Sequence, residues 1–216
     1  MTDSPTPNSA QQYWEGFYRE RDTPSERAGK PNELLVREAG SLAPGTALDL
    51  GCAEGGDAIW LAGQGWRVTA TDVSKTALRR AAGRAAEAGL AERVDWQQHD
   101  LSRSFPDGRF DLVSAQFLHS PVEAVGERTG ILRRAAQAVA PGGVLLIVGH
   151  AGWPSWQTAP PFDYHFPTTG EVLASLALEP GAWHVEIEEL LTRELPGPDG
   201  RTGTRADNVL KVRRGH

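Results

Sequence analysis

The stretch LDLGCAEGG, residues 48–56, decides the fold of this chain. An apolar run that contains an acid leads into a glycine-rich turn, and a helix-like segment, DAIWLAGQG, follows at residues 57–65. This order is typical of a strand whose turn presents backbone N–H groups and a helix N-terminus to a nucleotide-like ligand. The stretch therefore predicts the first strand–turn–helix unit of a parallel sheet that binds a cofactor at its carboxyl edge.

Strand and helix patterns alternate after this stretch. Strands are predicted at residues 46–50, 66–72, 93–100, 110–116 and 143–150. Helices are predicted at residues 55–62, after the capping residue Ser74, and at residues 123–140, where Pro141, Gly142 and Gly143 form a stop signal. The alternation predicts an α/β fold with a doubly wound, Rossmann-like parallel sheet.

The two ends of the chain depart from this alternation. Near the C-terminus a helix is predicted at residues 168–176, and the turn-rich loop PGPDGRTGT joins strands at 183–195 and 205–214 into a hairpin, so one of them runs antiparallel to the sheet. At the N-terminus, residues 1–9 are interpreted as a disordered tail. Residues 10–43 are interpreted as a helical lid on a single domain that spans residues 10–216.

Composition narrows the class of protein. The formal net charge is −6 and no basic stripe is present, so we expect no nucleic-acid partner. No apolar run approaches the roughly 18 residues of a membrane span, and the N-terminus does not resemble a signal peptide. The single cysteine, Cys52, excludes an intrachain disulfide and a cysteine-based zinc site. We therefore expect a cytoplasmic protein, and we interpret Arg79, Arg80 and Arg84 as a solvated helix face.

Acidic residues near the ends of three predicted strands point to the cofactor. Asp72 lies about 20 residues after the glycine turn, where a carboxylate can accept hydrogen bonds from ribose hydroxyls, and Asp100 ends the next strand. This arrangement suits either NAD or S-adenosylmethionine. A dinucleotide fingerprint requires a middle glycine where this chain has Ala53, and the acids Glu54 and Asp57 would repel a pyrophosphate. The same charges would favour an ammonium and a sulfonium, and so S-adenosylmethionine.

With these motifs in view, the chain resembles the class I S-adenosylmethionine-dependent methyltransferases. LDLGCAEGG is similar to the family's first motif, VTATDVS (68–74) to the second, HDLS (99–102) to the third, and FDLVSAQFLH (110–119) to the strand-four motif. The resemblance implies the strand order 3-2-1-4-5-7-6 with strand 7 antiparallel. Within the family, the step Gly29–Lys30–Pro31–Asn32 after an aromatic helix is most similar to small bacterial enzymes of the tellurite-resistance and thiopurine-methyltransferase kind.

The resemblance also implies S-adenosyl-L-methionine as cofactor and S-adenosyl-L-homocysteine as product. The residues that it predicts to bind the cofactor are Asp49, Gly51, Cys52, Ala53, Gly55, Asp57, Asp72, Val73, Ser74, Asp100, Leu101, Gln116 and Phe117.

Methyl transfer from a sulfonium needs alignment more than it needs a catalytic side chain. His119, after strand four, is the candidate general base, since its ordinary pKa suits proton transfer near neutral pH. A purely structural role for this histidine is the alternative. The predicted substrate pocket comprises Trp14, Tyr18, His119, His150, Trp153, Tyr164 and His165. No ligand spacing supports a metal site.

The acceptor is expected to be a small molecule, methylated on oxygen, nitrogen, sulfur or a metalloid. The step Gln116–Phe117–Leu118–His119 lacks the Asn/Asp-Pro-Pro-aromatic sequence of enzymes that methylate bases or glutamine. Two alternatives remain open: a regulatory protein that binds S-adenosylmethionine without turnover, and an NAD-type oxidoreductase. The chain is expected to be a monomer or a homodimer.

Overall fold

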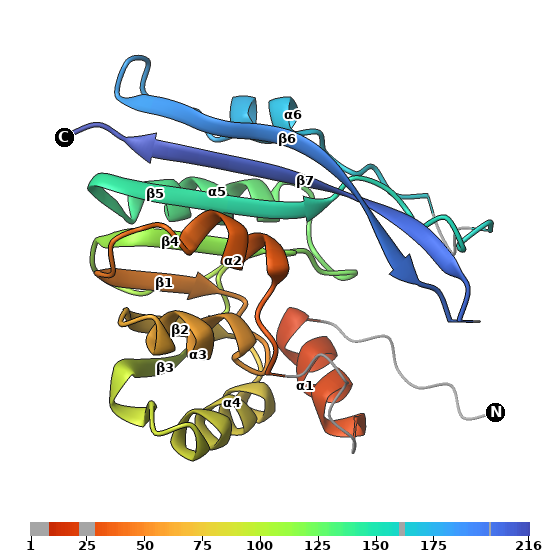
Figure 1. Cartoon of the computed structure of the whole chain (residues 1–216), viewed down its shortest axis with the longest axis horizontal. Coiled ribbons are helices and arrows are strands. Elements are labelled where there is room, and N and C mark those ends of the chain that lie inside the picture. Colours follow the sequence, from red (N-terminus) through yellow and green to blue (C-terminus); the bar gives the residue numbers. More distant parts are fainter. Residues whose placement is uncertain (1–8, 22–28, 160–162, 199) are drawn as a thin grey trace.

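A seven-stranded sheet forms the centre of the protein, in a computed structural model that describes residues 9–21, 29–159, 163–198 and 200–216. The strand order is β3-β2-β1-β4-β5-β7-β6 (Figure 1). β7 is antiparallel to both of its neighbours, and the other central pairs are parallel. The predicted strand order and the antiparallel seventh strand are therefore confirmed. The strands are β1 (Thr46–Leu50), β2 (Arg67–Asp72), β3 (Val94–Gln98), β4 (Phe110–Gln116), β5 (Val139–His150), β6 (Trp183–Pro196) and β7 (Thr202–Arg214).

Helices cover both faces of the sheet (Figure 1). They are α1 (Ala10–Glu20), α2 (Glu33–Ala39), α3 (Gly56–Gly63), α4 (Lys75–Glu87), α5 (Glu127–Gln137) and α6 (Thr169–Ser175), with a short 3-10 turn at Ala91–Arg93. Side chains of α2, α3 and α4 join one buried cluster, and those of α5 and α6 join the other. Ala47 faces the first cluster and its neighbour Leu48 the second, so β1 is apolar on both faces, as expected for a covered parallel strand.

The end of α5 and the start of β5 differ from the prediction. The expected helix at 123–140 is shorter at both ends, because Gly126, with φ 77°, precedes its first residue and the chain becomes extended at Val139. Pro141 and Gly142 then lie inside β5, near a register shift against β4, where Gly142 has φ 77°. A proline is tolerated in a strand at such an irregularity, so the stop signal marked a bend in a strand rather than a helix end.

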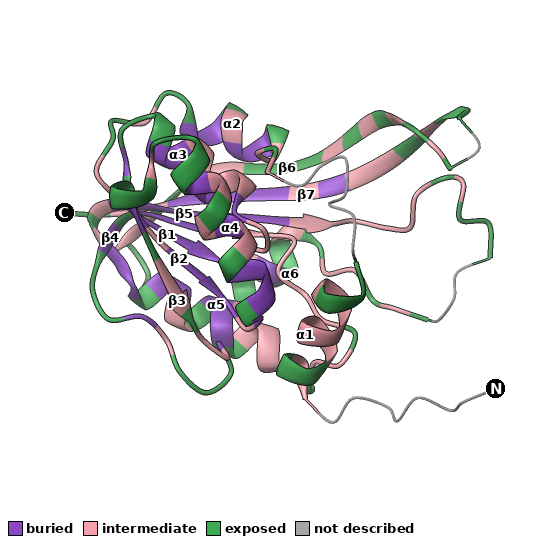
Figure 2. Cartoon of the chain, turned by 90° about the horizontal axis from the view of Figure 1, so that it is seen from below, coloured by how far each residue is buried: buried purple, intermediate pink, exposed green. Residues whose placement is uncertain are grey.

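Burial separates the sheet from two peripheral parts (Figure 2). The central strands are buried, whereas α1 has no buried residue and the outer parts of β6 and β7 are mostly exposed. Ser9 caps α1 by accepting a hydrogen bond from Gln12 N, and the rest of the predicted tail, residues 1–8, lies outside the described residues. Over the part of the chain that the structure describes, no helix has both the length and the apolar character needed to cross a membrane.

Candidate functional site

The turn after β1 has the backbone geometry that a close ligand requires. Gly51 and Gly55 have φ angles of 70° and 84°, and a Cβ atom at Gly51 would lie 2.8 Å from Leu118 Cδ1. Ala53, between them, also has a positive φ, of 51°. An alanine in this region is strained, because left-handed backbone favours glycine. The backbone therefore adopts the glycine-type turn even though the middle glycine is missing.

Asp72, the last residue of β2, fixes this turn. Its Oδ2 accepts a hydrogen bond from Ala53 N at 3.0 Å and its Oδ1 accepts one from Ser74 N at 2.9 Å. Burial raises the pKa of Asp72 to about 6, against the effect of these hydrogen bonds. The carboxyl group thus joins the turn after β1 to the N-terminus of α4 and lines a cavity between them.

Two buried oxygen atoms nearby have no hydrogen-bond partner within the described ranges. They are Asp49 Oδ2 and Gln116 Oε1, and both residues line a cavity of about 510 Å³ with Asp57. Burial and the neighbouring Asp57 and Asp72 raise the pKa of Asp49 well above its usual range. Burial also raises the pKa of Asp57 to about 6. Unpaired buried acceptors beside crowded acids suit a cationic ligand, so these residues fit the ammonium and sulfonium of S-adenosylmethionine.

A second cavity, of about 290 Å³, begins at Asp72 and Asp100 and reaches His119. Trp14 and Tyr18 of α1 line it from outside the sheet. Gly51, Ala53, Gln116 and Phe117 line both cavities, so the cavities meet at the glycine turn and the end of β4. This is the carboxyl edge of the sheet, where α/β folds bind ligands.

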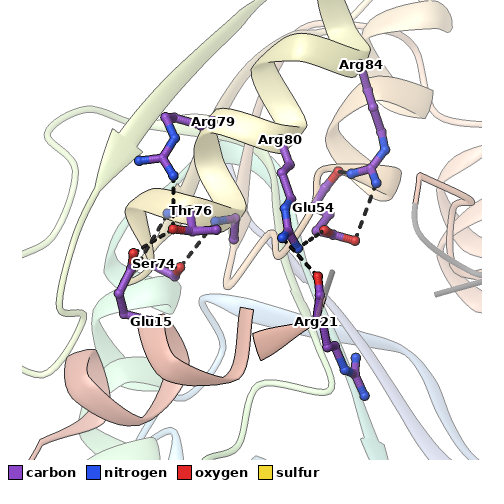
Figure 3. A network of polar contacts seen from close by, with 9 residues as sticks. Glu15, Arg21, Glu54, Ser74, Thr76, Arg79, Arg80 and Arg84 are labelled. Atoms are coloured by element: carbon purple, nitrogen blue, oxygen red, sulfur yellow. Dashed lines mark hydrogen bonds and ion pairs between the residues drawn. The ribbon is translucent and has the colours of Figure 1, made fainter. Parts of the chain in front are cut away.

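The helix α1, which we call the lid helix, is held on α4 by polar contacts at two points (Figure 3). Near its middle, Glu15 accepts hydrogen bonds from Ser74 Oγ at 2.7 Å and from Thr76 Oγ1 at 2.6 Å. Just beyond its last residue, the carbonyl of Arg21 accepts one from Arg80 Nη2 at 2.9 Å. Trp14 also donates its indole N–H to Ser120 Oγ at 3.2 Å. The lid helix is therefore fastened over the cavity by side chains rather than by a buried core.

The same contacts correct the interpretation of the α4 arginines. Arg80 and Arg84 form ion pairs with Glu54 of the glycine turn, at 3.1 and 3.5 Å, and their side chains are only 29% and 22% exposed. Arg79 donates to Thr76 Oγ1 at 3.1 Å. The prediction of a solvated helix face was wrong for Arg80 and Arg84, whose side chains reach back to the glycine turn, whereas Arg79 is exposed as predicted. The argument that Glu54 repels a pyrophosphate was also wrong, since its charge is compensated by Arg80 and Arg84.

The two predicted histidines lie side by side near the ends of β4 and β5. Their ring centroids are 5.1 Å apart, and His150 stacks on Phe117 at 4.3 Å. His150 Nδ1 is 2.9 Å from Asp207 Oδ1. Burial, followed by the charges of His150 and Arg128, lowers the pKa of His119 to about 4, and burial also lowers that of His150. Both rings are therefore neutral near pH 7, and the lowered pKa makes His119 a weaker base than the ordinary imidazole on which its prediction rested.

The remaining predicted residues divide between the cavity walls and their surroundings. Those that line a cavity are Cys52, Val73, Leu101 and Tyr164. Gly55 and Ser74 are the N-cap residues of α3 and α4 and support the cavity walls without lining them. Trp153 packs edge-to-face on Phe166, and His165 is largely exposed beside Glu171, so among the described residues neither lines the two cavities at the carboxyl edge. Over the described residues, no cluster of three or more potential ligands suits a metal ion.

Three residues that contribute to the site were not predicted. Glu15 holds the lid helix, Arg128 lines the cavity beside His119, and Asp207 binds His150. Of the three, only Asp207 could have been recognised from the sequence, because it is an acid next to the apolar run of the last strand. Glu15 and Arg128 occur in helical segments whose charge pattern is that of an ordinary solvated face.

Comparisons with known proteins agree with this geometry. Residues 47–143 match the family model described as "Methyltransferase domain". A 2-heptyl-1-hydroxyquinolin-4(1H)-one methyltransferase of Mycobacteroides abscessus is 35% identical over 130 residues, which are 58% of this chain. The chain spans only 55% of that relative's length.

Solved structures share the fold. One, from work on the conversion of a disulfide bond into a thioacetal group during echinomycin biosynthesis, has a TM-score of 0.72 at 23% identity, covering 96% of this chain and 92% of that one. TehB from Haemophilus influenzae has a TM-score of 0.67 at 16% identity, covering 94% of this chain and 67% of that one. At these identities the likeness concerns the fold alone.

Proposed function

We propose that this chain, a class I S-adenosylmethionine-dependent methyltransferase by family and fold, methylates a small molecule in the cavity between the glycine turn and His119. One observation carries the proposal. The cavity joins the cofactor acids Asp72 and Asp100 to a neutral histidine under the aromatic side chains of the lid helix. An acceptor there would lie next to the cofactor's reactive end and away from water.

The chain's own residues divide the work. Asp72 is placed to accept hydrogen bonds from the ribose hydroxyls, and Asp49, Asp57 and Gln116 offer oxygen atoms to the cationic end of the cofactor. Bound S-adenosylmethionine supplies a methyl group activated by a sulfonium. His119 accepts the proton of a protic acceptor, and Trp14 and Tyr18 exclude water.

The acceptor remains a matter of proposal. The relative from Mycobacteroides abscessus is named for a hydroxyquinolone, a small aromatic molecule, and the aromatic wall of this cavity suits one too. The narrower resemblance to the tellurite-resistance and thiopurine branch stays a prediction, because the likeness to TehB is one of fold. We also keep a monomer or homodimer as a prediction.

Two measurements test the proposal. Calorimetry with S-adenosylhomocysteine should show one site per chain. S-adenosylmethionine with a labelled methyl group, offered with a panel of phenols, thiols, amines and hydroxylated heteroaromatics, should give a labelled small molecule and S-adenosylhomocysteine. Binding without any labelled product would favour the regulatory alternative. Binding of NADH with no response to S-adenosylhomocysteine would favour the oxidoreductase alternative.

A further inference from the structure

Arg128 lines the same cavity as the cofactor acids Asp72 and Asp100. It is the second residue of α5 and, with His119, it lines both the 290 Å³ cavity and the small cavity behind it. Its Nε donates a hydrogen bond to the carbonyl of Leu118 at 2.7 Å, which fixes the direction of the guanidinium. The side chain is half-buried. An oriented cation therefore forms part of the wall next to the candidate base.

The two Nη nitrogens of this guanidinium are available to a ligand. Neither Nη nitrogen has a hydrogen-bond or ion-pair partner among the residues that the structure describes. Two acids line the same cavity, but Glu123 accepts from Ser120 N at 3.4 Å and Glu127 from Ala124 N at 3.1 Å, and neither is ion-paired with Arg128. Burial raises the pKa of Glu123, although the charge of Arg128 acts in the opposite direction.

The histidine and tyrosine side chains around Arg128 carry no charge near pH 7. His119 and His150 are kept neutral, chiefly by burial, and Arg205 adds a second positive charge that disfavours protonation of both rings. Tyr164 lines the small cavity, and burial raises the pKa of its phenol, so it too is uncharged near pH 7. The charged side chains that share this cavity wall with Arg128 are therefore the acids Glu123 and Glu127.

An arginine held by its Nε presents two parallel Nη–H donors, which match the two oxygens of a carboxylate. We propose that Arg128 forms an anion subsite and that the methyl acceptor carries a carboxylate which binds there. The inference rests on the proposed function and deepens it. The carboxylate would be held beside His119, and the aromatic body of the molecule would pack against Trp14 and Tyr18 of the lid helix.

A pair of matched probes tests the subsite without knowledge of the natural acceptor. 4-Fluorobenzoate and its neutral counterpart 4-fluorobenzamide are titrated into protein saturated with S-adenosylhomocysteine, with binding followed by fluorine NMR. The wild-type protein should bind the benzoate at least about tenfold more tightly, since a hydrogen bond to a charged group contributes about 1.5–3 kcal/mol. Equal affinity for the two probes, or no binding of the benzoate at about 20 mM, would overturn the inference.

Variants assign the preference to Arg128. Arg128→Met should remove it, whereas Arg128→Lys, which keeps the charge but loses the fork, should retain part of it. Lys75→Met, an equal change of charge at an exposed position of α4, should leave it intact. Persistence of the preference in Arg128→Met, in protein whose unfolding temperature shows that it is folded, would also overturn the inference. If S-adenosylhomocysteine itself does not bind, the proposed function fails; if it binds and no anion preference appears, only the subsite fails.

Discussion

Asp207 holds His150 in one orientation across the antiparallel pair of β5 and β7. The two residues are direct register partners, and Asp207 Oδ1 lies 2.9 Å from His150 Nδ1. Burial raises the pKa of Asp207, but its hydrogen bonds with His150 and Arg193 outweigh burial and lower it overall, so the carboxylate is ionised and the ring nitrogen must be the donor. His150 thereby keeps its other nitrogen free to act as an acceptor.

Replacing Asp207 should be costly, because Arg193 also binds this carboxylate, with Nε 3.0 Å from Oδ2. We expect Asp207→Ala to lower the free energy of unfolding by about 3 kcal/mol, as for other buried pairs that lose one partner. Asp207→Asn should cost less, because its amide oxygen still accepts a hydrogen bond. It should also lower the pKa of His150 further, which an NMR titration would detect. A loss below about 1 kcal/mol in Asp207→Ala would contradict this assignment.

His119→Ala should lower kcat and leave the affinity for S-adenosylhomocysteine unchanged, if the acceptor has a proton to lose. The pKa of His119, about 4, means that the ring stays neutral through pH 6–8, so the rate should not fall through protonation of this group until the pH approaches 4. His119→Gln, of similar size but unable to act as a base, should be equally slow. If His119→Ala has the same kcat as the wild type, the role of His119 is structural.

Asp72→Asn should weaken the binding of S-adenosylhomocysteine by about 1.5–3 kcal/mol, the usual contribution of a hydrogen bond to a charged group. Calorimetry measures the change directly. Asp72→Ala would free both Ala53 N and Ser74 N, whereas asparagine, with a single acceptor oxygen, keeps a partner for one of them. Unchanged affinity would mean that the ribose binds elsewhere.

The pKa of Asp72 also predicts two effects of pH. Protons compete with the ribose hydroxyls for the carboxylate, so the affinity of the wild-type protein should rise with pH through about 6. The folded pKa lies above the ordinary value of 3.8, so this group stabilises the ligand-free fold fully below about pH 4 and loses that contribution as the pH rises through 6. Relative to the wild type, Asp72→Asn should therefore become more stable as the pH rises from 4 to 7, which urea unfolding would show.

Glu15→Ala should loosen the lid helix. Burial raises the pKa of Glu15, but hydrogen bonds from Thr76 and Ser74 prevail and lower it to about 2. Its contribution is therefore complete above pH 4.5 and is lost as the pH falls toward 2. Losing these bonds should cost on the order of 1 kcal/mol, or roughly fivefold faster amide exchange in α1. Glu20→Ala, at an exposed position of the same helix, is the control and should leave exchange unchanged.

Ala53→Gly should stabilise the protein by about 1 kcal/mol, because the left-handed backbone of Ala53 is strained. Ala177 also has a φ of 51° and lies outside the cavities, so Ala177→Gly is a matched control. Both variants should unfold at higher temperature, and only Ala53→Gly should change cofactor affinity. If either glycine variant unfolds at a lower temperature than the wild type, the backbone at that alanine is not strained.

The sequence predicted the inner strands well because β1, β4 and β5 contain apolar runs beside glycines or acids, and β1 and β4 match the predicted ranges. The prediction of a helix end at Pro141 and Gly142 failed. A proline–glycine step occurs both after helices and at irregular points of strands, so the sequence alone does not distinguish the two. The cofactor acids were found from their positions after strands. Glu15 and Arg128 were missed, because nothing in a helical charge pattern says which polar side chains turn toward a cavity.

Arg80 connects the cofactor turn with the lid helix, since one guanidinium binds both Glu54 and the carbonyl of Arg21. We therefore expect the residence time of a bound molecule to depend partly on the ion pair between Arg80 and Glu54. Such a pair, partly exposed, is weakened by dissolved salt. Ligand dissociation should quicken as ionic strength rises, whereas release past a lid held only by apolar packing would not respond in this way.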